Sequence, residues 1–129
     1  MKAEQELLQA YREWCRLAKA ETKAIQTRNW GLLSDCHLAI QDFQTLIPGL
    51  TQEARAEWQH AGCNLAEKEA SIGVYVAELM ELTRQNHSLL QSTRRAVRQQ
   101  LDQLGTAGQN LKLLHRSYGF VPGSWSRAA

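Results

Sequence analysis

The chain contains few of the residues that interrupt regular structure. Its 129 residues include only two prolines and eight glycines. A β protein of this size would need more turn formers, whereas Leu, Ala, Gln, Glu and Arg, which are common here, suit helices. The composition therefore predicts an all-α protein. One hydrophobic core is the default at this length, so we expect a single domain over residues 1–129.

Cysteine and long apolar runs are also scarce. The three cysteines, Cys15, Cys36 and Cys63, are an odd number in a chain large enough to fold without covalent cross-links. Such usage favours a reducing compartment, so we expect free thiols. The first residues lack the apolar region of a signal peptide, and no stretch approaches the roughly 20 apolar residues of a membrane span. We therefore expect a cytoplasmic protein that does not insert into membranes.

Sequence motifs that carry chemistry are missing as well. The patterns GxGxxG, GxxxxGK[ST], HExxH and GxSxG do not occur, and the carboxylates are scattered at solvent-face spacings, so we do not expect an enzyme. A turn at residues 48–49 would bring Cys36 and His37 level with His60 and Cys63, which are zinc-compatible ligand types. Adjacent residues on a helix point about 100° apart, however, so Cys36 and His37 cannot easily face one ion. We expect no metal and no cofactor.

Apolar residues recur at three- and four-residue steps along most of the chain. This spacing predicts three helices, over residues 3–28, 30–47 and 51–104. Asn29 is the expected cap of the second helix, which should end at Pro48-Gly49, and Thr51 should cap the third. The short connections predict an up-down-up antiparallel bundle of three helices, and Gly73 is the favoured place for a bend in the long third helix.

Residues 105–129 are expected to differ from the bundle. Gly105 and Gly108 predict a hinge, which is followed by a short amphipathic segment and by a mobile tail from Val121. The third helix would be about 80 Å long, against about 40 and 27 Å for the first two, so part of its apolar face should outrun them. That face must fold back, pair with a second copy or bind a partner. The residues predicted to bind a partner are Val97, Leu101, Leu104, Leu111, Leu114 and Tyr118.

Charge is distributed unevenly along the chain. Residues 1–83 carry a net charge of −4 and residues 84–129 a net charge of +6. Basic side chains at 94, 95, 98, 112 and 116 could contact phosphates, but they lack interleaved aromatic residues, and a solvated helix face is the favoured interpretation. Nucleic-acid binding through the basic C-terminal region is therefore a minor alternative.

Three segments resemble the bacterial flagellar export chaperones of the FlgN/FliT type. They are the joint between the first two helices, residues 21–33, the sequence Asn86-His87-Ser88-Leu89-Leu90, and the closing Leu113-Leu114-His115-Arg116-Ser117-Tyr118-Gly119. The resemblance implies a cytoplasmic chaperone of type III secretion that binds the helical ends of hook-associated or capping subunits and delivers them to the export gate. It also implies that the C-terminal helical region binds the subunit and that Tyr118 helps to engage the gate.

A second class of protein fits the same pattern. A self-associating structural or adaptor bundle would bury the exposed apolar face against a second copy, as a homodimer. The sequence leaves the chaperone and the adaptor open, with nucleic-acid binding as the third interpretation.

Overall fold

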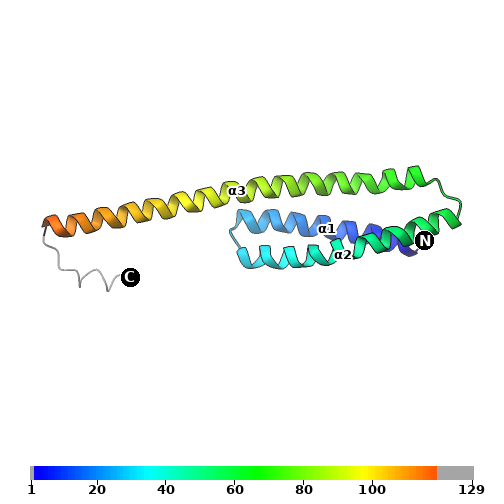
Figure 1. Cartoon of the computed structure of the whole chain (residues 1–129), viewed down its shortest axis with the longest axis horizontal. Helices are drawn as coiled ribbons and strands as arrows, with labels where there is room; N and C mark the ends of the chain where they lie inside the picture. Colours follow the sequence, from blue (N-terminus) through cyan, green and yellow to red (C-terminus); the bar gives the residue numbers. More distant parts are fainter. Residues whose placement is uncertain (1, 119–129) are drawn as a thin grey trace. The chain divides into compact units, whose positions relative to one another are not determined.

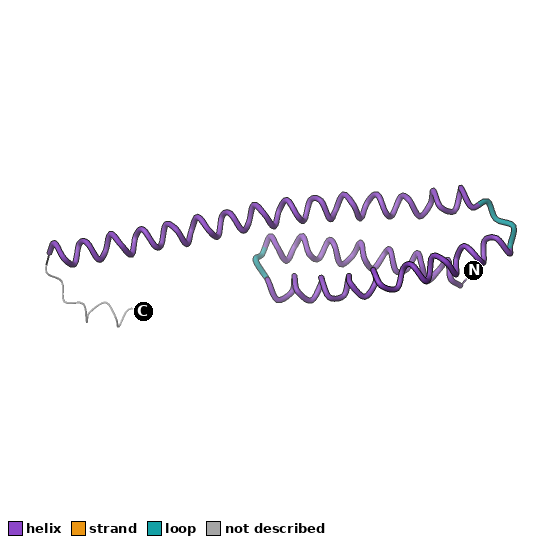
Figure 2. The backbone as a smooth tube through the Cα atoms, viewed as in Figure 1, coloured by secondary structure: helices purple, strands orange, loops and turns teal. Residues whose placement is uncertain are grey.

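The computed structural model describes residues 2–118, and all the regular structure in this range is helical. The elements are α1 (Lys2–Gln26), α2 (Trp30–His60) and α3 (Leu65–Tyr118), as Figures 1 and 2 show. The predicted all-α class is confirmed. Within the described range, no helix combines the length and apolarity that crossing a bilayer requires.

The chain divides by its internal contacts into two units, Met1–Gln91 and Ser92–Ala129. The first unit contains α1, α2 and the first half of α3, and the described part of the second unit is the helix over residues 92–118. The single domain predicted from chain length stays a prediction. The predicted mobile tail from Val121 lies outside the described residues.

Polar contacts fix the order and direction of the three helices in the first unit. The Glu57 carboxylate of α2 accepts hydrogen bonds from the Ala3 N–H at 3.0 and 3.2 Å, which satisfies an orphan donor at the start of α1. Next to it, Lys68 of α3 pairs with Glu4 at 2.8 Å. The start of α1 therefore lies at the end of α2 and the start of α3, which confirms the up-down-up bundle (Figure 1).

The core of the first unit lies along α1. Leu7 of α1 is completely buried, and Trp58 of α2 is 1% exposed in the same core. Tyr11 stacks on Tyr75 of α3 with ring centroids 6.2 Å apart, so the third helix joins this core through aromatic contact. The three cysteines are free thiols, as predicted.

The predicted end of the second helix at Pro48-Gly49 is wrong, because α2 continues through Pro48 to His60. Proline inside a helix removes one backbone hydrogen bond and costs about 3 kcal/mol. Burial outweighs this cost, since Ile47 and Leu50 on either side of the proline are both in the core. The prediction that Thr51 caps a new helix is wrong for the same reason. Its hydroxyl instead donates to the Ile47 carbonyl at 2.8 Å.

The break between the second and third helices lies at residues 61–64, so the predicted third helix over 51–104 is wrong at both ends. Gly62 has a φ of +72°, and the Cys63 N–H donates to the Trp58 carbonyl at 2.9 Å while the Gly62 N–H donates to Gln59. This is the hydrogen-bond pattern of a Schellman C-cap. Asn64 then caps the start of α3, since its side chain accepts from the Ala66 N–H at 3.0 Å.

Glycines within α3 do not interrupt it. The helix runs through Gly73, where a bend was predicted, and through Gly105 and Gly108, where a hinge was predicted. A single glycine costs a helix about 1 kcal/mol relative to alanine, which a long helix tolerates. The predicted hinge before residue 110 is therefore wrong, and the short amphipathic segment is the last part of α3. Asn29 does cap α2, as predicted, by accepting the Leu32 N–H at 3.1 Å.

Two glycine substitutions are expected to change stability in opposite directions. A Cβ added at Gly73 would meet nothing within 4 Å, so Gly73→Ala should stabilise the first unit by about 0.5–1 kcal/mol. Gly62→Ala should destabilise it by about 1 kcal/mol or more, because alanine is strained at positive φ. Urea denaturation followed by circular dichroism measures both. A destabilised Gly73→Ala variant would contradict the uninterrupted helix.

Candidate partner-binding surfaces

The residues predicted to bind a partner lie on the helix of the second unit and are mostly exposed. Leu101 is 63% exposed and Leu104 is 68% exposed, while Leu111 and Leu114 are also exposed and Val97 is half-buried. Tyr118 is the last residue of α3, and its side chain lies outside the described part of the structure. The helix of the second unit thus presents leucines to solvent.

A regular heptad spacing joins five of these six predicted residues. Steps of four and three residues alternate from the first member to the last, which is the spacing of a coiled-coil seam. Gly108 and His115 complete this spacing, and we call the seven residues the C-terminal stripe: Val97, Leu101, Leu104, Gly108, Leu111, His115 and Tyr118. Leu114 lies beside the stripe, about 80° from Leu104 around the helix. Sequence reasoning missed Gly108 and His115 because it assigned the first to a hinge and considered only apolar residues.

The flanks of the C-terminal stripe are basic. Residues 92–118 contain five Lys/Arg and one Asp/Glu, a net charge of +4. Residues 1–91 contain nine Lys/Arg and twelve Asp/Glu, a net charge of −3. The two units therefore carry net charges of opposite sign.

The first unit has an apolar groove between α1 and α3 that sequence reasoning did not find. Its volume is about 590 Å³, and it is lined mainly by apolar side chains that include Tyr11 and Trp14 of α1 and Val76, Leu79 and Met80 of α3. Met80 is 68% exposed, which leaves the groove open to solvent. An exposed apolar patch of this kind is typical of a binding surface.

Two further hollows adjoin this groove and extend it along the bundle. One, of about 440 Å³, shares Val76 and Met80 with it and reaches Glu69 near the start of α3. The other, of about 170 Å³, shares Thr83 and His87 with it and reaches Leu90. We call the three together the trough. It runs along α3 from residue 69 to residue 90, entirely within the first unit.

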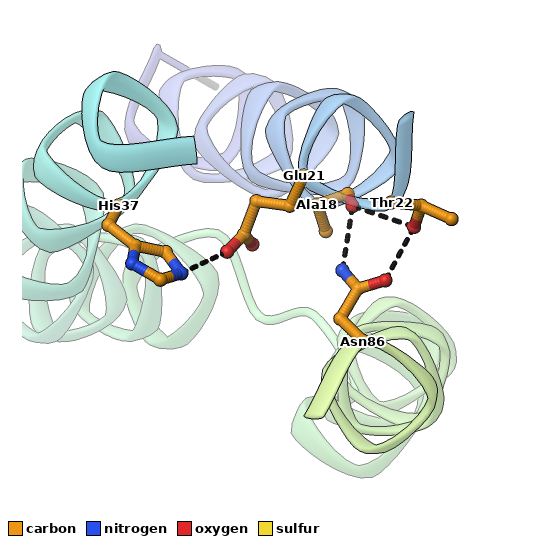
Figure 3. A network of polar contacts seen from close by, with 5 residues as sticks. All are labelled: Ala18, Glu21, Thr22, His37 and Asn86. Carbon is orange, nitrogen blue, oxygen red and sulfur yellow. Dashed lines mark hydrogen bonds and ion pairs between the residues drawn. The ribbon is translucent and has the colours of Figure 1, made fainter. Parts of the chain in front are cut away.

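A buried polar network contributes Asn86 to the hollow at one end of the trough, and Figure 3 shows its side chains. Asn86 of α3 is 6% exposed, and its side-chain amide donates to the Ala18 carbonyl of α1 at 2.8 Å. The Thr22 hydroxyl donates to the Asn86 side-chain oxygen at 2.5 Å. Because an amide needs both partners when it is buried, this network fixes one register of α3 against α1.

A second polar contact, next to this network, joins α1 to α2. Glu21 is buried, and its carboxylate lies 2.5 Å from the His37 imidazole (Figure 3). Burial raises the pKa of the Glu21 carboxyl above its ordinary value, and His37 opposes that shift. Glu21 and His37 line the same hollow as Asn86, so polar groups of all three helices meet there, beside the apolar side chains of Ile25 and Leu90.

The cysteine and histidine side chains considered as zinc ligands do not come together in the structure. It required a turn at residues 48–49, and α2 is helical there, so Cys36 and His60 lie 24 residues apart on one helix. Among residues 2–118, the structure contains no group of three His, Cys, Asp or Glu side chains that could hold a metal ion.

Sequence and structure comparisons identify no relative of this chain. No protein-family model matches it, and no curated protein or solved structure matches it significantly.

Proposed function

We propose that the chain is a helix-binding export chaperone of the flagellar type, which holds the helical termini of a hook-associated or capping subunit on its C-terminal stripe. The observation that carries this proposal is the exposure of Leu101 and Leu104, since more than three fifths of each side chain remains open to solvent. A seam with heptad spacing is suited to a partner that is itself an amphipathic helix.

The flagellar assignment itself rests on the resemblance of three segments of the chain. Helical ends that form coiled coils in an assembled filament would present the matching heptads, and covering them would prevent premature assembly. In this proposal the chain works in the cytoplasm, and Tyr118 at the end of α3 contributes to engagement of the export gate.

Isothermal titration calorimetry against a flagellar hook–filament junction protein tests the proposal. The variant Leu104→Ala/Leu111→Ala removes two leucines from the C-terminal stripe. Each leucine side chain buried on binding contributes about 1.5–3 kcal/mol, so the double variant should bind about 100-fold more weakly or worse.

Leu113→Ala is the matched control. Leu113 is 57% exposed and comes nine residues after Leu104, which places it on the opposite face of the same helix. We expect it to bind as the unmodified chain does. Equal affinity of the double variant and the unmodified chain would contradict binding at the C-terminal stripe, and absence of binding by the unmodified chain would contradict the substrate class.

A further inference from the structure

We propose that the trough of the first unit binds the C-terminal stripe of a second copy of this chain. The contact joins two different surfaces. When the stripe of each copy lies in the trough of the other, the two contacts form a closed dimer. This inference does not rest on the proposed function, and a subunit bound to the stripe would displace the second copy.

The trough and the stripe have the same length. The trough follows α3 from Glu69 to Leu90, which is 22 residues or about 32 Å of helix. The stripe runs from Val97 to Tyr118, which is also 22 residues and about 32 Å. A helix laid along the trough would add a fourth helix to the three of the first unit, and four-helix bundles are a stable way to cover such a surface.

The middle of the trough is apolar and its charges are already paired. Arg55 of α2 and Glu69 of α3 form an ion pair at 3.1 Å, and Arg84 pairs with Glu81 through two hydrogen bonds. Among the apolar side chains there, Val76 and Met80 are exposed to solvent. Leucines of the C-terminal stripe would cover these side chains without burying an unpaired charge.

The net charges of the two units favour a second copy of this chain as the occupant of the trough. The first unit has a net charge of −3 and residues 92–118 have a net charge of +4, so the helix of one copy is attracted to the first unit of another. Residues 92–118 continue the helix that forms one wall of the trough in the same copy. We therefore assign the trough to the stripe of a second copy.

Sedimentation velocity over a concentration series tests the inference on the full chain. The unmodified chain should self-associate reversibly, and raising the salt concentration should weaken its association. Met80→Glu in the trough and Leu104→Glu in the stripe should each raise the dissociation constant at least tenfold. Both side chains are 68% exposed, so neither change should disturb folding, which circular dichroism checks.

Each variant has a matched control on the same helix. Val74, the site of the control Val74→Glu, is 69% exposed but does not line the trough, and Leu113, the site of Leu113→Glu, lies opposite the stripe. Both controls introduce the same charge and should associate as the unmodified chain does. An effect of the controls equal to that of the test variants would overturn the inference, because the added charge alone would then explain it.

Mixing the two test variants separates this contact from pairing between two stripes. Met80→Glu keeps an intact stripe and Leu104→Glu keeps an intact trough, so a mixed dimer restores one of the two contacts and the mixture should associate more tightly than either variant alone. Pairing of stripe with stripe predicts full association of Met80→Glu and no rescue by mixing. Either of those results, or an unmodified chain that is monomeric at every concentration, overturns the inference.

Discussion

Trp58→Ala is expected to destabilise the first unit by about 3–5 kcal/mol, enough to unfold much of it at room temperature. Trp58 is 1% exposed and packs with Leu7 in the main core, so alanine would leave a large cavity that three rigid helices cannot close. Equilibrium denaturation in urea, followed by circular dichroism, measures the loss.

Trp58→Phe separates packing from hydrogen bonding at the same position. The indole N–H of Trp58 is buried and has no hydrogen-bond partner in the described chain, so tryptophan supplies bulk here rather than a polar contact. Phenylalanine keeps most of that bulk and removes an unsatisfied donor. We expect a loss below about 1.5 kcal/mol. A loss as large as that of alanine would mean that the indole N–H has a partner in solution.

Asn86→Asp is expected to destabilise the first unit by about 3–5 kcal/mol at neutral pH. The substitution preserves shape but replaces the amide that donates to the Ala18 carbonyl with a carboxylate oxygen. A buried charge would then face a carbonyl, and the Glu21 carboxyl lines the same hollow. Burial would raise the pKa of the new carboxyl, so the penalty should shrink as the pH falls through that pKa and the protonated acid can donate to Ala18.

Asn110→Asp makes the same chemical change at an exposed position of α3. It should alter the free energy of unfolding by less than about 0.5 kcal/mol at any pH between about 4 and 7. Denaturation curves at several pH values compare the two variants. If Asn86→Asp matched the control at neutral pH, Asn86 would not connect α1 and α3 through its amide.

Local patterns predicted the helices of this chain better than they predicted where the helices end. The apolar spacing of Ile40, Phe43, Ile47, Leu50 and Ala54 continues across Pro48 without a change of phase, and this was the available signal that α2 does not stop. A proline on the exposed side of a helix is a local cost, whereas the apolar spacing reports the burial of a whole face.

The boundary between α2 and α3 was harder to predict than the continuation of α2, because a glycine can either end a helix or lie inside one. Gly62 and Gly73 both come after helix-forming residues, yet only Gly62 has positive φ. The difference lies in the residues on the C-terminal side of each glycine. Asn64 can cap a new helix two residues after Gly62, and no such cap stands at the same distance from Gly73.

The two candidate surfaces differ in how far sequence can predict them. The leucines of the C-terminal stripe share one helix, so periodicity alone predicted five of its seven members. The trough needs side chains from three helices, and its location depends on the register that Asn86, Thr22 and the Glu57 contact establish. A register between helices is a tertiary property, and the sequence pattern of any one helix does not contain it.

The cores at the two ends of the first unit are unequal in size. The larger contains Leu7, Trp58 and Leu79, whereas the smaller, near the α1–α2 connection, has only Ala24, Ile25 and Leu33 as buried members. Local opening should therefore start at the smaller one, and amide protons there should exchange faster than those beside Trp58. The two ends of the bundle therefore differ in local stability. Binding beside the smaller core would reduce local opening there and leave the larger core unchanged.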